Sequence, residues 1–99
     1  MGADPEGKRL IVADLKVSVV SADHEIWSGT ASMVVARTTE GEIGILPGHE
    51  PLLAILATGE VRVSVSGGSA IRAKADDGFL SVEHDSVTIV ARNAELVSD

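Results

Sequence analysis

The 99-residue sequence contains no cysteine and no tyrosine, and it has only one tryptophan and one phenylalanine. Without cysteine, neither a disulfide framework nor a thiolate metal site can form, and nothing requires an oxidising compartment. Two aromatic side chains are too few to line a sugar-stacking cleft or to stack unpaired bases. The hydrophobic core must therefore be built mainly from Val, Ile, Leu and Ala.

Clustered bases are also scarce. The formal net charge is −7, from 15 acids against 8 bases, and the bases are scattered singly apart from Lys8-Arg9. A surface that binds phosphates needs clustered Lys and Arg, so nucleic acid is not expected as a partner. An acidic domain of this kind is better suited to docking on a basic or neutral surface.

Long hydrophobic runs are missing as well. The apolar run 10–13 ends at Asp14, well short of the ~7–15 residues of a signal-peptide core or the ~20 of a membrane span. No direct membrane insertion is expected, and the cytoplasm is the default compartment. Any association with a membrane must depend on a partner protein.

The sequence instead contains 13 Val and 7 Ile, which favour strands because β-branched side chains fit a pleated surface. Turn signals recur about every 5–12 residues, a rhythm typical of an all-β sandwich or barrel. They are Asp23-His24-Glu25, Ser28-Gly29, Glu40-Gly41, Pro47-Gly48, Thr58-Gly59, Gly67-Gly68, Asp76-Asp77-Gly78 and His84-Asp85.

Individual strands are predicted from period-two alternation. Val61–Val65 and Ile71–Ala75 both alternate, and Gly67-Gly68 between them predicts a hairpin in which they pair. Leu52–Ala57 is compatible with a strand or with a single helical turn. Further strands are predicted at Leu15–Ala22, Ala31–Arg37, Phe79–Glu83 and Val87–Ala91.

One domain accounts for the whole chain, because about a hundred residues can bury only one core. Residues 1–14 begin with a polar stretch that has no periodicity, and they are interpreted as a flexible extension. Residues 15–97 are expected to form the domain. No internal repeat or linker divides them.

No constellation of catalytic or metal-binding residues is convincing. His24, His49 and His84 lie 25 and 35 residues apart, unlike the close pairs of recognisable zinc sites. A nucleophile elbow is missing. Glu40 and Glu42 could share a face, but a glycosidase would also need aromatic residues around them. We expect no catalytic residue, no metal and no cofactor.

Trp27 has two open interpretations. It is either a core or inter-sheet anchor followed by a turn at Ser28-Gly29, or an exposed hot spot that contacts a partner.

The segment Gly41–Leu53 is the most constrained stretch of the chain. Pro47-Gly48 predicts a type II turn, and Pro51 favours an extended conformation at the preceding residue. The imidazole of His49 and the neighbouring acids are therefore expected to be presented to solvent.

The motifs GEIGI (41–45) and PGHEPLL (47–53) together closely resemble the signature of the epsilon subunit of the rotary proton-translocating ATP synthase. The resemblance extends in order from about residue 15 to residue 94. It includes VSVVSAD (17–23), IWSG (26–29), GEVR (59–62), DGFLSV (77–82) and VTIVA (87–91). Trp27 and the sequence Arg37-Thr38-Thr39 resemble the actinobacterial branch.

The resemblance implies a flattened β-sandwich of about ten short, mainly antiparallel strands in the rotor, or central stalk, of the synthase. Such a subunit couples the gamma subunit to the polar loops of the membrane c-ring, lies peripherally at the cytoplasmic face of the cell membrane, and performs no catalysis itself. By resemblance, Glu42 contacts the c-ring and His49 lies close by, with Glu40 and Gly48 in the same surface. Ser21 matches a position that faces gamma.

Typical family members continue as a C-terminal helical hairpin, which is expected to be absent here because the sequence ends at Asp99. Inhibitory and nucleotide-binding roles are therefore not expected. The alternative to the rotor interpretation is a free-standing β-sandwich that binds a small ligand or assembles with itself.

Overall fold

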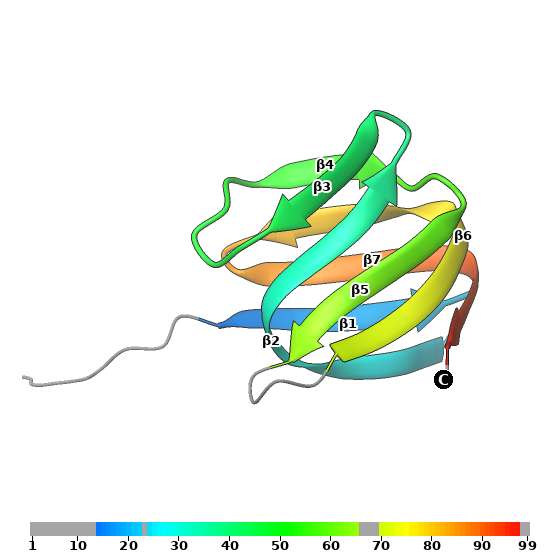
Figure 1. The fold of residues 1–99 in the computed structure, drawn as a ribbon, viewed down its shortest axis with the longest axis horizontal. Helices are drawn as coiled ribbons and strands as arrows, with labels where there is room; N and C mark the ends of the chain where they lie inside the picture. Colours follow the sequence, from blue (N-terminus) through cyan, green and yellow to red (C-terminus); the bar gives the residue numbers. More distant parts are fainter. Residues whose placement is uncertain (1–13, 23, 66–69, 98–99) are drawn as a thin grey trace, which may run out of the picture.

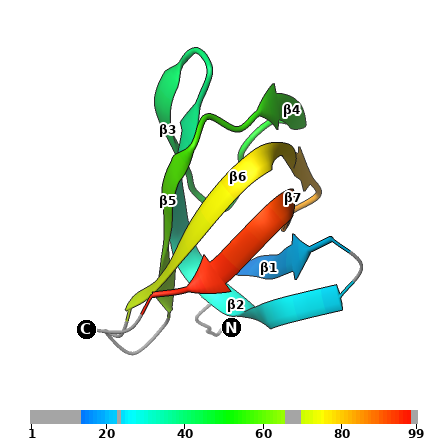
Figure 2. The ribbon, with the colours of Figure 1, turned by 90° about the vertical axis from the view of Figure 1, so that its right-hand side faces the viewer.

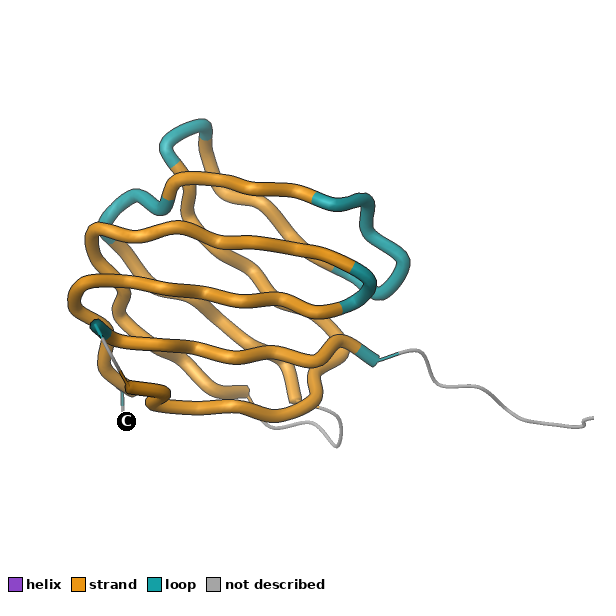
Figure 3. Tube along the Cα trace, turned by 180° about the vertical axis from the view of Figure 1, so that it is seen from behind, coloured by secondary structure: helices purple, strands orange, loops and turns teal. Residues whose placement is uncertain are grey.

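The computed structural model describes residues 14–22, 24–65 and 70–97. Within them the chain forms strands and loops without a helix (Figures 1 and 3). The predicted extension, up to residue 13, and the predicted Gly67-Gly68 turn lie outside the described residues. The seven strands are β1 Leu15–Ser21, β2 His24–Thr38, β3 Gly41–Ile45, β4 Leu52–Ile55, β5 Gly59–Val65, β6 Ala70–Glu83 and β7 Ser86–Leu96. The predicted all-β class is confirmed.

The strands are joined into one strongly folded sheet with the order β1-β7-β6-β5-β2-β3. An additional antiparallel pairing between β1 and β2 closes the sheet on itself. All pairings are antiparallel except β1 with β7. One layer contains β3, β5 and the C-terminal part of β2, and the other contains β4, β7 and β1, with β6 crossing between them (Figure 2).

The core lies between these layers and is aliphatic, as the composition requires. In β1, β5 and β7, buried and more exposed residues alternate, so that one face of each strand points inward. The largest fully buried side chains are Leu15, Ile45, Leu80, Ile89, Val19, Val34, Val61, Val63, Val82 and Val87.

Several strand predictions are confirmed. Val61 pairs with Ala73 and Val63 with Ile71, as the predicted hairpin requires. Leu52–Ile55 is a strand, which resolves the ambiguity between strand and helical turn. His84 and Asp85 form the predicted two-residue turn, and both have positive φ angles of 49° and 61°.

The resemblance implied about ten short strands, whereas the described residues form seven, and two of the predicted turns lie inside long strands. Ser28-Gly29 belongs to β2, which has 15 residues, and Asp76-Asp77-Gly78 belongs to β6, which has 14. The turn predicted next to His24 does separate two strands, because β1 ends at Ser21 and β2 begins at His24. Turn-forming residues here bend strands without ending them, because cross-strand pairing continues on both sides of each bend.

The bend in β6 forms a corner of the sandwich. β5 pairs with residues 70–75 of β6, and β4 pairs with residues 79–82 further along the same edge of that strand. Asp77, at the corner, has a φ of 61°. A Cβ atom on Gly78 would lie 1.9 Å from the backbone oxygen of Val90, so only glycine lets β6 and β7 approach this closely.

Trp27 is half-buried and packs against the core cluster. Its ring lies over Gly29, where an added Cβ would be 2.9 Å from a ring carbon. The structure supports the core-anchor interpretation, except that a strand, not a turn, follows the tryptophan.

Candidate functional site at the open edge of the sandwich

The segment Gly41–Leu53 forms the open edge of the sandwich. Among the described strands, β3 pairs with β2 alone and β4 with β6 alone, so each leaves one edge unpaired. Both edges lie on the same side of the molecule, at the top of Figure 1. The backbone N–H of Thr39 donates to the carbonyl of Ile55 at 3.0 Å, which links the two layers where β2 ends.

Glu40 and Glu42 are exposed at the tip of the β2–β3 hairpin, as predicted. The tip is held by Thr38, which is 5% exposed. Its hydroxyl donates to the carbonyl of Gly41 at 2.7 Å and accepts from the N–H of Glu40 at 3.1 Å. The hairpin therefore presents its two carboxylates from a fixed backbone.

Gly48 and His49 lie in the loop that follows β3. Gly48 has a φ of 87°, and the N–H of His49 donates to the carbonyl of Leu46 at 3.1 Å, as expected for a type II turn. The Gly48 N–H donates to the Asp85 carboxylate at 2.7 Å, which ties this loop to the β6–β7 turn. His49 is less presented than predicted: it is half-buried, and its Nδ1 lies 2.7 Å from the carbonyl oxygen of Glu50.

The structure does not bring these residues together as one cluster. Glu42 is at the beginning of β3 and His49 lies beyond its end. At ~3.3 Å per residue, Glu42 and Ile45 alone are ~10 Å apart along the strand. The predicted contact residues therefore line a long edge, with an acidic tip at one end and a histidine loop at the other.

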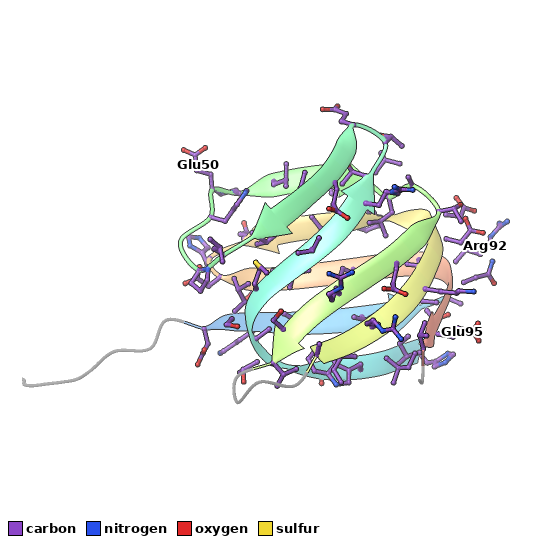
Figure 4. All side chains as sticks on the ribbon, viewed as in Figure 1. Glu50, Arg92 and Glu95 are labelled. Carbon is purple, nitrogen blue, oxygen red and sulfur yellow. The ribbon has the colours of Figure 1, made fainter. Side chains whose placement is uncertain are left out.

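Ser21 lies at the end of the sandwich away from the loop that contains His49. It is 8% exposed, and its hydroxyl accepts a hydrogen bond from the N–H of Ala94 at 3.1 Å. Figure 4 shows Arg92 and Glu95 at this end and Glu50 at the other. The Ser21 hydroxyl thus fastens β1 to β7 and adjoins a cavity of about 610 Å³. That cavity is lined by Ser21, Thr58, Gly59, Glu60, Lys74, Ala75, Asp76, Asn93, Ala94 and Glu95.

A row of apolar side chains crosses the outer face of the layer that contains β4. Ile55 pairs with Phe79, Phe79 with Val90, and Val90 with Val20, so the row crosses β4, β6, β7 and β1. Ile55 and Phe79 are 58% and 38% exposed, and Leu53, two residues from Ile55 on β4, is 69% exposed. We call these five residues the apolar row.

Sequence reasoning missed the apolar row because exposed and buried positions are both apolar in these strands. In Leu52–Leu56 and Phe79-Leu80 consecutive residues are hydrophobic, so alternation could not distinguish the two faces. The unbroken apolar runs were the available signal, since a strand with one solvated face usually alternates.

Fold and edge together define a small all-β domain of the sandwich class. The family model of the "ATP synthase, Delta/Epsilon chain, beta-sandwich domain" matches residues 14–97. The chain therefore belongs to this family.

Curated relatives support the same assignment. The ATP synthase epsilon chain of Micrococcus luteus is 54% identical over 85 residues, which cover 86% of this chain and 93% of the relative. The epsilon chain of Frankia casuarinae is 54% identical over 83 residues, covering 83% and 96%. That of Streptomyces griseus is 44% identical over 89 residues, covering 90% and 72%. The expected similarity to the actinobacterial branch is confirmed.

Solved structures show the same fold. A chain of the Euglena gracilis mitochondrial ATP synthase, in a structure of OSCP, F1 and c-ring, matches with a TM-score of 0.81 and 29% identity. The match covers 92% of this chain and 58% of the Euglena chain. A chain from the central stalk and c-ring of the Tetrahymena thermophila enzyme has a TM-score of 0.66 at 17% identity, covers 82% of this chain and 65% of that chain, and supports the fold alone.

Proposed function

We propose that this chain is the rotor subunit of a proton-translocating ATP synthase that couples the gamma subunit to the c-ring. The observation that carries the proposal is the family match over residues 14–97, together with epsilon chains covered over more than nine tenths of their length. The subunit is non-catalytic and transmits torque between its neighbours. Its domain is assigned to residues 15–97.

The apolar row supplies the surface for gamma. An exposed Leu, Ile and Phe on one sheet face are unfavourable in water, and such patches typically mark protein interfaces. Burying one large apolar side chain contributes about 1.5–3 kcal/mol, so a few of them suffice to hold a partner. Ser21 and the neighbouring cavity lie at one end of the molecule and would meet gamma through the rim of the cavity.

The open edge supplies the surface for the polar loops of the c-ring, through Glu40 and Glu42 at the hairpin tip and Gly48 and His49 in the loop. An exposed ion pair contributes only about 0–1 kcal/mol. A joint that resists torque therefore needs contacts along the whole edge, which the separation of the two groups along β3 provides.

Membrane association follows from assembly into the complex at the cytoplasmic face of the cell membrane. In residues 14–22, 24–65 and 70–97, no helix is long and apolar enough to cross a bilayer. The c-ring is the membrane-embedded partner in this arrangement.

The test is association with purified gamma at micromolar concentrations. The wild-type chain is expected to co-elute with gamma, and Ile55→Asp with Phe79→Asp is expected to weaken binding at least tenfold, because charged groups cannot enter an apolar contact without a large desolvation cost. Leu96→Asp is the matched control: Leu96 is 47% exposed and lies outside the apolar row, so binding should change less than twofold. A folded wild-type chain that never binds gamma would refute the proposal.

Self-assembly is the second candidate, favoured by the two unpaired edges at β3 and β4 beside exposed apolar residues. It predicts a stable homo-oligomer of the isolated chain in sedimentation experiments, and no affinity for gamma.

A further inference from the structure

Positive charge gathers on the outer face of β2, β3, β5 and β6, the layer opposite the apolar row. Four of the 8 bases in the chain, Arg37, Arg62, Arg72 and Lys74, occupy outward positions there. Glu42 and Glu60 lie among them. This basic face is unexpected in a chain whose net charge is −7.

Cross-strand pairing places two of these bases directly against each other. Gly44 pairs with Val35, Val35 with Arg62, and Arg62 with Arg72. Like charges on opposed positions of neighbouring strands destabilise a sheet. Arg72 is compensated by the Glu60 carboxylate 3.5 Å away, whereas among the described residues neither Arg62 nor Arg37 is in an ion pair.

A hollow of about 290 Å³ lies between Arg37 and Arg62. The Arg37 side chain packs against Gly59 at the start of β5, where an added Cβ would lie 3.3 Å from the arginine Cδ. Glycine at this position therefore lets the arginine lie flat beside the hollow. The lining residues are Val35, Arg37, Glu42, Gly59, Glu60 and Arg62.

Gly44, next to this hollow, is a glycine that the isolated domain does not need. Its φ is not among the positive values, and a Cβ atom added to it would meet nothing within 4 Å. Glycine weakens a strand interior, and its usual justifications are a bulge, a bend or the close approach of another backbone. β3 is an edge strand with no bulge and no crowding at Gly44, so the close approach of another backbone remains as the explanation.

We propose that the hollow is a socket for an acidic side chain from the same c-ring loop that contacts Glu42, and that Gly44 lets the backbone of this loop approach β3 closely. The inference rests on the proposed function and adds to it the chemistry of the partner. The loop carries both a base for Glu42 and an acid for Arg37 and Arg62. The joint is thus held by charges of both signs, which also fixes its register.

A protein loop fits this face better than a lipid or nucleic acid surface. Glu42 and Glu60 stand between the bases, and a uniformly anionic surface would be repelled by them. Neither aromatic residue that could stack on nucleobases lies on this face. Trp27 packs against the core, and Phe79 belongs to the apolar row on the opposite face. Alternating charge matches a loop with acidic and basic side chains.

The experiment compares affinity for gamma alone with affinity for the gamma–c-ring complex stripped of this subunit. The wild-type chain is expected to bind the larger complex more tightly. Arg37→Glu with Arg62→Glu, and separately Gly44→Val, should each lose at least tenfold of that additional affinity and bind gamma alone as wild type does. Lys16→Glu, an exposed charge reversal on β1, is the control and should change neither affinity more than twofold.

The melting temperature of each free chain separates docking from folding. Gly44→Val should melt at or above the wild-type temperature, because valine favours strands and nothing crowds it there. Undiminished additional affinity in both variants would overturn the socket while leaving the proposed function intact. If the wild-type chain binds the gamma–c-ring complex no more tightly than gamma alone, the c-ring part of the proposed function is refuted. Binding to phosphatidylglycerol vesicles that is lost on charge reversal, with rotor affinity unchanged, would overturn the socket in favour of a lipid site.

Discussion

Gly78 shows how much of the fold can depend on a single residue. A methyl group there would overlap the Val90 oxygen at 1.9 Å and the Ala91 Cα at 2.5 Å. Both contacts are backbone atoms, so relief requires β6 and β7 to separate at the corner. We expect Gly78→Ala to lower the free energy of unfolding by about 3 kcal/mol or more, at the upper end of overpacking costs.

Urea denaturation measures this effect, with Gly44→Ala as the matched control. Gly44 is also a strand glycine, but an added Cβ meets nothing within 4 Å, so its replacement should leave the midpoint unchanged or raise it slightly. Equal midpoints for both variants would show that the corner relaxes freely.

Residue-level predictions from the sequence succeeded where local chemistry decides the outcome. The type II turn at Pro47-Gly48 and the exposed acids at Glu40 and Glu42 follow from turn residues and hydrophilicity. The partial burial of His49 did not follow, because it depends on how the loop folds back, a tertiary effect without a local signal.

Strands and loops depend on contacts between distant parts of the chain, and this is why a local turn signal did not always end a strand. Asp76-Asp77-Gly78 has the composition of a turn, yet β6 continues through it because β7 pairs on both sides. The apolar row was hidden for the related reason that alternation cannot show which of two apolar faces will be covered. Core strands with alternating patterns, such as Val61–Val65, were correctly predicted.

The loop that contains His49 depends on a single side chain from another hairpin. The Asp85 carboxylate accepts from the Gly48 N–H at 2.7 Å, and Asp85 itself has a φ of 61°. Asp85→Gly removes the carboxylate while keeping a residue that tolerates this φ. We expect amide hydrogen exchange at Gly48 to become at least about tenfold faster, because a hydrogen bond to a charged group is worth about 1.5–3 kcal/mol.

Global stability should change little in Asp85→Gly, because the Asp85 carbonyl still accepts from the Lys16 N–H at the backbone. Asp85→Asn is the control, since an amide oxygen can accept the same bond and asparagine tolerates positive φ. Unchanged exchange at Gly48 in the glycine variant would mean that the loop is held by other contacts.

The domain has two different outer faces: one carries the apolar row, and the opposite one carries charged residues. The open edge lies between them. The pairing of β1 with β2 closes the sheet at one end, whereas β3 and β4 each pair with a single strand and leave open edges at the other end. A stiff body with distinct faces suits a joint between two partners, because each face can match its own partner without rearrangement.

The N-terminal boundary of the folded domain can be predicted from the contacts of its first residues. Leu15 is 0% exposed, and Lys16 donates its N–H to the carbonyl of Asp85 at 2.8 Å, so the folded unit needs both residues. A chain that starts at Asp14 should melt within about 2 °C of the full chain. A chain that starts at Val17 loses the burial of Leu15, about 2–3 kcal/mol, and should melt about 10–20 °C lower, since 1 kcal/mol corresponds to about 4–8 °C in a domain of this size. Calorimetry of both chains locates the boundary.

A large loss of stability in the Asp14 chain would place part of the folded unit before residue 14, and an unaffected Val17 chain would show that the first pairs of β1 with β2 and β7 are dispensable.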